Sequence, residues 1–353
     1  MDALQQLADK SKDSILPIIP LKPWATSKSL SNTVKKINTS FGDRKVIVDI
    51  DLESLVDYRA RDVEDIYRDV FQELELLTSS NDGYINWFNF ISANENFIPV
   101  VQLADLTQID KQLLTLSSLN RGLVFRFDVY DIDYDQHLQT LSRIASFRFE
   151  DMLIVYDYGQ ITRDIFNYMD GVISLVTKTS EILHNPMICV SSTSFPSSFK
   201  GISDTDFSII ERLLFNKLRN EVDSVRLIYS DWGSARADKI GGGGRIPPPR
   251  IDYPLRDEWM ILRSDFDDVN DIKDGEKNAI YTHLASMLLE KNYWNQDLHV
   301  WGTQLIELTA KGDSYGINSA QRATAARINI HLHQQLNYDS PDDLTDTDEM
   351  WVD

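Results

Sequence analysis

Eight short apolar runs, each followed by a stretch with helical periodicity, divide the chain between residues 15 and 292. Runs of this length and composition fit strands, and strands that alternate with helices form βαβ units in a parallel sheet. Eight units predict an α/β fold, a closed (β/α)₈ barrel of the TIM type, in which an active site would lie at the carboxyl ends of the strands. The runs are ILPIIPLK from Ile15, KVIVDID from Lys45, FIPVVQLA from Phe97, GLVFRFDVYD from Gly122, MLIVYDYG from Met152, MICVSSTSFP from Met187, SVRLIYSDWG from Ser224 and EWMILRSD from Glu258.

The same pattern predicts how the chain is organised. We expect the barrel to span residues 1–293 and to be interrupted after its second strand by a helical segment at 58–96. This insertion holds an aromatic segment with Tyr84 and Trp87, which we expect to fill core at the barrel rim; a lid or a partner surface is the alternative. Residues 294–338 should form a C-terminal helical extension. Residues 339–353 contain seven acidic and no basic side chains and should form a disordered acidic tail.

Composition narrows the classes of function. A formal net charge of −20 with a sequence pI near 4.6 disfavours general nucleic-acid binding and adsorption to an anionic membrane, because both need clustered Lys and Arg. The single cysteine, Cys189, lies in an apolar strand and is expected to be buried rather than reactive. We find no disulfide framework, signal-peptide pattern or apolar run of about 18 residues in this sequence, which predicts a cytoplasmic protein.

Polar side chains near the ends of the runs identify a candidate site. Side chains alternate between the two faces of a strand, and the face that packs on the helices must be apolar. Asp49 and Asp51 of the second strand should therefore point toward the barrel axis, as should Arg126 of the fourth strand and Asp157 of the fifth. Around this mouth we predict catalytic roles for Asp49, Asp51, Arg126, Asp128, Asp157, Asp231 and Arg263, and ligand-binding roles for Lys22 and Ser194. The same reasoning places Gln102 and Ser192 near the axis.

These charges have two interpretations. They could form ion pairs that close the top of the core, with Arg126 beside Asp49 or Asp157. Buried ion pairs, however, give little net stability compared with apolar packing. Four inward carboxylates on three neighbouring strands therefore favour a ligand or catalytic site, and the structural network is the alternative.

Several reaction classes can be compared with this set. Asp157 and Asp231 could supply the two carboxylates of a retaining glycosidase, about 5–5.5 Å apart, but aromatic platforms for a sugar are scarce. No histidine stands at the end of a run, which disfavours a zinc centre, whereas an all-oxygen Mg²⁺ site on Asp49, Asp51 and Asp157 stays open. A G-x-S-x-G elbow for a serine nucleophile is missing from the sequence. The cofactor is therefore left undetermined.

A second candidate site follows the seventh run. The segment GSARADKIGGGGRIPPPR, residues 233–250, brings four successive glycines and several basic residues into an acidic chain. Loops after the seventh and eighth strands of barrels commonly bind phosphate. We predict that Arg236, Lys239 and Arg245 bind an anionic small molecule. A flexible loop with a polyproline brace is the alternative.

The order of the strand motifs resembles the phage Beta protein family. The resemblance rests on ILPIIPLK, VDIDLE, FIPVV and F-R-F-D, and continues through VYDYG, SSTSFP, SDWG, RIDYP and WMILR. In such proteins a basic-x-Glu helix start tends to follow SSTSFP; here Ile209 stands in the basic position before Glu211. The resemblance implies a place in prophages, satellites and bacterial defence loci, with a Gop-type toxic partner and a CII-type regulator encoded nearby. It implies no catalytic mechanism.

Three functional hypotheses follow. The first is a component of an antiviral defence module that acts with protein partners encoded in the same locus. The second is a stand-alone barrel hydrolase of a phosphorylated or nucleotide-like small molecule. The third is an inactive scaffold whose insertion and acidic tail recruit partners.

Overall fold

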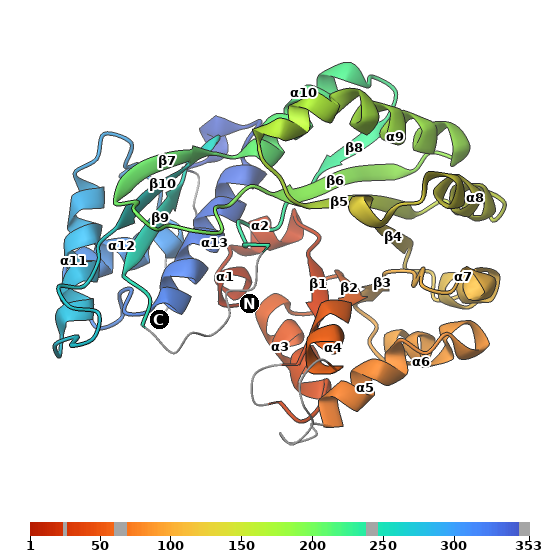
Figure 1. The fold of residues 1–353 in the computed structure, drawn as a ribbon, viewed down its shortest axis with the longest axis horizontal. Helices are drawn as coiled ribbons and strands as arrows, with labels where there is room; N and C mark the ends of the chain where they lie inside the picture. The colour runs from red at the N-terminus through yellow and green to blue at the C-terminus, as the bar shows by residue number, and fades with distance from the viewer. Residues whose placement is uncertain (24–26, 60–68, 238–245, 346–353) are drawn as a thin grey trace.

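The computed structural model describes residues 1–353 except 24–26, 60–68, 238–245 and 346–353. The chain forms a mixed α/β molecule with two parts (Figure 1). One part is built on parallel strands with helices along their outer side. The other is a small antiparallel sheet covered by the last three α-helices.

Seven strands follow one another in parallel order. β1, β2 and β3 form one sheet, a single bridge between Val100 and Val124 leads to β4, and β4, β5, β6 and β8 continue the order. Within the described residues no strand pairing joins β8 to β1, so a closed barrel is not observed. The strands are β1 (Ile18–Leu21), β2 (Val46–Ile50), β3 (Phe97–Pro99), β4 (Leu123–Asp128), β5 (Met152–Gln160), β6 (Met187–Thr193) and β8 (Arg226–Tyr229).

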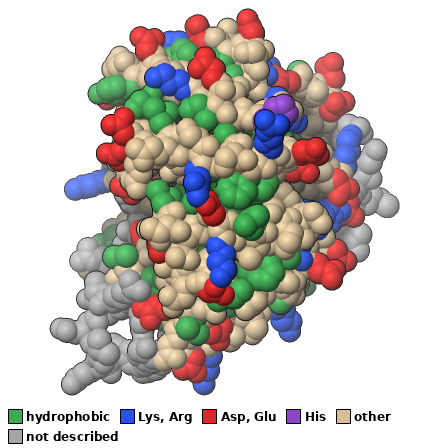
Figure 2. Space-filling model, turned by 90° about the vertical axis from the view of Figure 1, so that its right-hand side faces the viewer, with side chains coloured by type: hydrophobic (Ala, Val, Ile, Leu, Met, Phe, Trp, Pro, Cys, Tyr) green, Lys and Arg blue, Asp and Glu red, His purple; other side chains and the backbone are tan. Residues whose placement is uncertain are grey.

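Helices cover one face of these strands, and the largest hydrophobic cluster lies between the two layers. Val46, Val48 and Ile154 belong to that outer cluster. The helices are α3 (Ser31–Phe41), α4 (Leu52–Arg59), α5 (Asp69–Leu77), α6 (Asn81–Ser92), α7 (Ile109–Ser117), α8 (Tyr134–Ala145), α9 (Met169–Ile182) and α10 (Ile210–Glu221). Figure 2 shows the face at the right of Figure 1, where Lys and Arg side chains lie beside Asp and Glu side chains. Exposed ion pairs on these helices, such as Lys111 with Asp82 and Arg143 with Asp110, contribute little stability.

The opposite face of the strands carries a separate, smaller core. Ile47, Val124, Val155 and Cys189 are buried together there, on the side away from the outer helices. This agrees with the alternation expected for β2, β4 and β5, because their neighbours in sequence join the outer cluster. Burial raises the pKa of the Cys189 thiol to about 12, so this side chain behaves as a small hydrophobe.

The eighth apolar run does not complete a barrel, which corrects the (β/α)₈ prediction. It forms β10 (Glu258–Arg263), the central strand of an antiparallel sheet with β7 (Asp204–Ser208) and β9 (Arg250–Pro254). Trp259 and Ile261 pack on one side of β10, and Leu262 packs on the other. An apolar run indicates burial on both faces but not the direction of pairing. Strand β7 is not one of the eight predicted runs.

A second hydrophobic core joins this sheet to the C-terminal helices. Tyr253 and Leu262 from the sheet are buried with Leu305 and Ile330 from the helices, so residues on both sides of position 293 share one core. The helices are α11 (Glu276–Leu289), α12 (Trp301–Ala310) and α13 (Ala320–Leu336). Helix α13 also contacts α1 (Asp2–Gln5), which is followed in the chain by α2 (Asp9–Asp13). The side-chain amide of Asn329 on α13 donates to the carbonyl of Ala3 at 3.2 Å.

The inserted segment packs as core, as we expected. The indole of Trp87 is fully buried and its Nε1 donates to the Val100 carbonyl at 3.0 Å. The hydroxyl of Tyr84 accepts from the backbone N–H of Asp105 at 2.9 Å. Both contacts tie α6 to the carboxyl end of β3. Part of the predicted amphipathic helix, residues 60–68, lies outside the described residues.

The beginning of the acidic tail lies against the body, whereas we expected it to be disordered from residue 339. Asp339 pairs with Arg219 of α10 at 2.9 Å, and the carbonyl of Leu344 lies 2.8 Å from Nε2 of His333. Residues 346–353 lie outside the described residues.

Candidate functional site

Arg126 joins two carboxylates at the carboxyl ends of the parallel strands. Its Nε and one terminal nitrogen donate to Oδ2 of Asp157 at 3.0 and 2.6 Å, and its other terminal nitrogen donates to Oδ2 of Asp49 at 3.0 Å. Burial opposes the charge of the guanidinium, but Asp157 and Asp49 outweigh it and raise the pKa of Arg126. One of the two interpretations of the sequence was an ion pair of Arg126 with Asp49 or Asp157; the structure has both.

Two further side chains extend this group of charged residues at the carboxyl ends of the parallel strands. The indole Nε1 of Trp232 donates to Oδ1 of Asp157 at 3.0 Å, and the side-chain amide of Gln102 donates to Oδ1 of Asp49 at 3.3 Å. We call Asp49, Gln102, Arg126, Asp157 and Trp232 the mouth cluster. Its members come from five different strands or the residues that follow them, and only the inward Asp49, Gln102, Arg126 and Asp157 were expected there.

Arg126 is the most exposed of the charged residues of the mouth cluster. The side chains of Asp49 and Asp157 are 13% and 6% exposed, whereas that of Arg126 is 37% exposed. A guanidinium has five N–H donors, and the contacts to the two carboxylates use three of them. Two donors are therefore left to face solvent or a bound molecule, over a floor of fixed carboxylates. This arrangement suits a small polar ligand with an acceptor oxygen.

Two predicted catalytic aspartates have local structural roles instead. Asp51 follows β2 and accepts from the backbone N–H and the hydroxyl of Ser54, at 3.0 and 2.6 Å, so it caps the start of α4. Asp128 is exposed and accepts from the backbone N–H of Tyr130 at 3.1 Å. Neither is part of the mouth cluster, so Asp49, Asp51 and Asp157 do not converge as a Mg²⁺ site would require. No group of three or more His, Cys, Asp or Glu suited to a metal occurs in the described part of the chain.

Asp231 and Ser194 face the helices rather than the axis, which corrects their predicted position. Oδ2 of Asp231 accepts from the Tyr229 hydroxyl at 2.6 Å and lies 2.9 Å from Nε2 of His331 on α13. The hydroxyl of Ser194 donates to Oε2 of Glu211 on α10. Both residues lie beyond the ends of their strands, where alternation no longer fixes the direction of a side chain. Ser192 is on the same face as Ile188 and Val190, the face toward the helices.

Asp231 and Glu211 differ sharply in charge state. Burial works to raise the pKa of Asp231, but the charge of His331 and the hydrogen bonds from His331, Tyr229 and the Gly233 N–H lower it to about 2. Burial and the nearby charge of Asp231 raise the pKa of Glu211 to about 7, although its bonds from Ser194 partly oppose this. One carboxylate is therefore ionised at neutral pH and the other is poised near its midpoint.

Sequence reasoning missed His331 and Glu211. His331 was set aside because it lies in the C-terminal region, far along the chain from any strand end, and only the packing of α13 brings it to Asp231. Glu211 was passed over because a basic residue did not precede it. A usable signal was the spacing of Arg327 and His331, four residues apart on one helix, which places both on the same face.

The remaining predicted residues do not join the mouth cluster. The side chain of Lys22 is exposed, and its carbonyl accepts from Thr33 at 2.9 Å. Arg263 lies on β10 and donates to Asp265 and to the carbonyl of Ile202, so it is part of the antiparallel sheet. Arg236 stacks over Phe199, with 4.7 Å from its guanidinium carbon to the ring centre. Lys239 and Arg245 lie outside the described residues.

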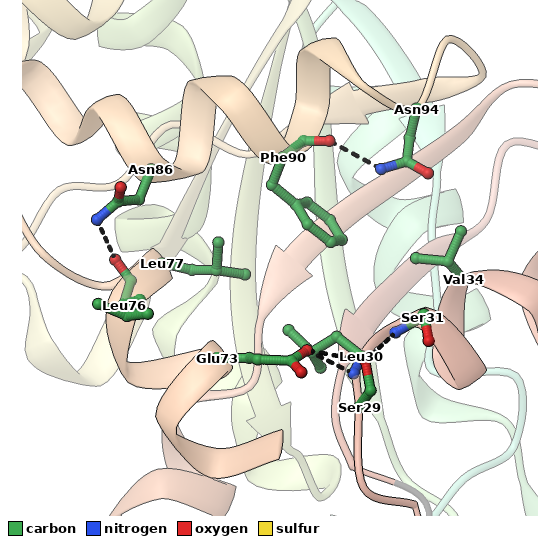
Figure 3. Close-up of a pocket in the computed structure, with 10 residues that line it drawn as sticks. All are labelled: Ser29, Leu30, Ser31, Val34, Glu73, Leu76, Leu77, Asn86, Phe90 and Asn94. Carbon is green, nitrogen blue, oxygen red and sulfur yellow. Dashed lines mark hydrogen bonds between the residues drawn. The ribbon is translucent and has the colours of Figure 1, made fainter. Parts of the chain in front are cut away.

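A separate cavity of about 470 Å³ lies between the start of α3 and helices α5 and α6 (Figure 3). Apolar side chains, among them Leu30, Leu77 and Phe90, supply most of its wall. Glu73 also lines it, and Oε2 of Glu73 accepts from the backbone N–H of Leu30 at 2.8 Å, which caps α3. No residue of the mouth cluster lines this cavity.

Comparison with known proteins gives a family but no solved structure. The model of the Beta protein family matches residues 1–337. The chain is 27% identical over 347 residues to "Protein beta" of Enterobacteria phage P4, and the match covers 95% of this chain and 89% of that protein. No solved structure matches it. None of the described helices is long and apolar enough to cross a membrane.

Proposed function

Because the chain belongs to the Beta protein family, we propose that it is a component of an antiviral defence module carried by a phage, prophage or satellite. It acts in the cytoplasm of the bacterial host, together with protein partners encoded in the same locus. Its own contribution is to bind a small polar molecule at the carboxyl ends of the parallel strands. Ligands of α/β proteins bind at this end of a sheet, and barrel enzymes use the same position.

The observation that supports the proposed ligand site is that Arg126 is exposed while the two carboxylates that it contacts are largely buried. A purely structural ion pair gains most when all its donors are satisfied inside the protein. Here the guanidinium is fixed by Asp49 and Asp157 while part of it stays open. Such preorganisation lowers the free energy lost on binding, because the donors do not have to be ordered by the ligand.

Asp157→Asn tests this proposal. Asn keeps an acceptor for the indole of Trp232 and the N–H of Gly159, and Arg126 keeps its contact with Asp49 and with solvent. The side-chain NH₂ group of Asn, however, replaces Oδ2, which accepts from two nitrogens of Arg126. We therefore expect a loss of stability of about 1–3 kcal/mol that leaves the protein folded, together with loss of phage protection in a host that carries the complete locus. The measurements are plating efficiency and thermal unfolding of the purified variant. Asp135→Asn is the matched control, because Asp135 is exposed in the first turn of α8.

Two outcomes would favour the other hypotheses. If the purified protein alone releases phosphate from a small phosphorylated substrate and Asp157→Asn stops this, the stand-alone hydrolase explains the site better. If Asp157→Asn is stable and fully protective, the mouth cluster is not a functional site. The scaffold would then be the better account, and deletion of residues 339–353 would be its test.

A further inference from the structure

Three arginines meet at the loop after β8, and one carboxylate, that of Asp252, pairs with two of them. Arg327 of α13 donates to Oδ2 of Asp252 at 2.7 Å, and Nε of Arg250 lies 2.7 Å from Oδ1 of the same aspartate. Arg236 makes no ion pair with any described residue. The three side chains therefore carry two more positive charges than the single carboxylate balances, in a chain whose net charge is −20.

This arginine cluster, Arg236, Arg250 and Arg327, is largely buried. The side chains of Arg327, Asp252 and Arg250 are 3%, 3% and 15% exposed. Burial and the charges of Arg250 and Arg327 lower the pKa of Arg236 to about 10. Unpaired buried charge is costly, so the cluster is electrostatically incomplete as it stands.

Aromatic rings and a tight turn hold the arginines in place. The guanidinium carbon of Arg250 lies 3.5 Å from the ring centre of Phe199, over which Arg236 also stacks, and that of Arg327 lies 3.8 Å from the ring centre of Phe195. Arg327 also donates to the hydroxyl and the carbonyl of Ser234, at 3.2 and 3.1 Å. All three nitrogens of Arg327 already donate within the protein, so Arg327 contributes mainly its charge. Stacking leaves the guanidinium edges of Arg236 and Arg250 available, and such edges match the geometry of phosphate oxygens.

We infer that Arg236, Arg250 and Arg327 form a binding site for a phosphate-like dianion, either free phosphate or the terminal phosphate of a small metabolite. The excess of two positive charges matches a dianion. Arg250 and Arg327 are the fixed part of the site, since Asp252 and the rings orient them. Arg236 is partly exposed and is the side by which an anion enters. This site is distinct from the mouth cluster and does not depend on its function.

Arg236→Gln is the discriminating variant. Arg236 has no ion-pair partner among the described residues that its removal would leave unpaired. We therefore expect the variant to fold, with a melting temperature in the absence of anion equal to or above that of the parent. Its affinity for anion should fall by about tenfold or more, because one charge-assisted contact is lost. Arg327→Gln is a poor test, since it would leave the buried Asp252 without one of its two ion-pair partners. Arg226→Gln, on an exposed side chain of β8, is the control and should bind like the parent.

Isothermal titration of the full chain with inorganic phosphate, pyrophosphate and AMP measures these affinities, with sodium chloride of equal ionic strength as the blank. Saturable binding by the parent that Arg236→Gln weakens supports the site. Tighter binding of AMP identifies a phosphorylated metabolite as the source, whereas equal or tighter binding of phosphate identifies the free anion. No saturable binding by the parent, or equal affinity of parent and Arg236→Gln, would overturn the inference.

Discussion

At the scale of single residues, Glu211 is a buried carboxyl group whose charge the fold opposes. It is 2% exposed and stands near the ionised Asp231. A carboxyl whose pKa is about 7 in the fold, against 4.5 in the unfolded chain, is protonated more readily in the folded state. The folded state is therefore favoured below about pH 4.5, and this contribution is lost as the pH rises through 7.

Glu211→Gln isolates this effect. Gln keeps an acceptor for Ser194 but cannot ionise, so the variant should become more stable relative to the parent as the pH rises from about 4.5 to about 7. The difference in unfolding free energy should grow by up to roughly 1.4 kcal/mol per pH unit in that window. Urea unfolding across this range measures it, with Glu221→Gln, exposed at the far end of α10, as the control. Parallel pH profiles for Glu211→Gln and the parent would refute the assignment.

At the scale of elements, α12 and α13 pack so closely that one position accepts only glycine. A Cβ at Gly302 would lie 2.5 Å from the Ala326 carbonyl oxygen and 2.6 Å from Cγ1 of Ile330. Helix α13 in turn holds Arg327 and His331 against the loop after β8. The packing of α12 on α13 thus fixes the positions of Arg327 and His331.

Gly302→Ala should therefore destabilise the protein by about 1–3 kcal/mol, because two helices must separate to admit the methyl group. The matched control is Gly171→Ala in α9, where a Cβ would meet nothing within 4 Å. Alanine there should stabilise by about 0.5–1 kcal/mol, through its higher helix propensity. Chemical denaturation of both variants provides the comparison. A neutral Gly302→Ala would show that α12 and α13 can move apart freely.

Elements also show what the sequence could and could not predict. Seven of the eight predicted runs form parallel strands, in the order in which they follow one another in the sequence. The eighth run was assigned to the wrong sheet. A central antiparallel strand that is buried on both faces has the same apolar composition as a buried parallel strand, so composition does not distinguish them. Strands β7 and β9 were missed, since β7 reads DTDFS and is half exposed, without the apolar run of a buried strand.

At the scale of the whole molecule, the candidate site shows which positions the alternation of side chains along a strand can predict and which it cannot. Asp49, Arg126 and Asp157 lie inside regular strands, where alternation fixes their direction, and they meet as expected. Asp231, Ser194 and Arg263 lie past strand ends or in the antiparallel sheet, where alternation gives no guidance. The contribution of α13 depends on contacts between residues about 100 positions apart, such as Asp231 with His331, which no local pattern encodes.

The central claim is that the mouth cluster binds a small molecule. Native mass spectrometry of the protein isolated from phage-infected cells that carry the complete locus tests it most directly. We predict a bound species of small mass on the parent protein and its loss from Asp157→Asn, while Arg236→Gln at the separate arginine cluster keeps it. Spectra that show the bare mass of the chain for the parent, or the same bound species on Asp157→Asn, would contradict the claim.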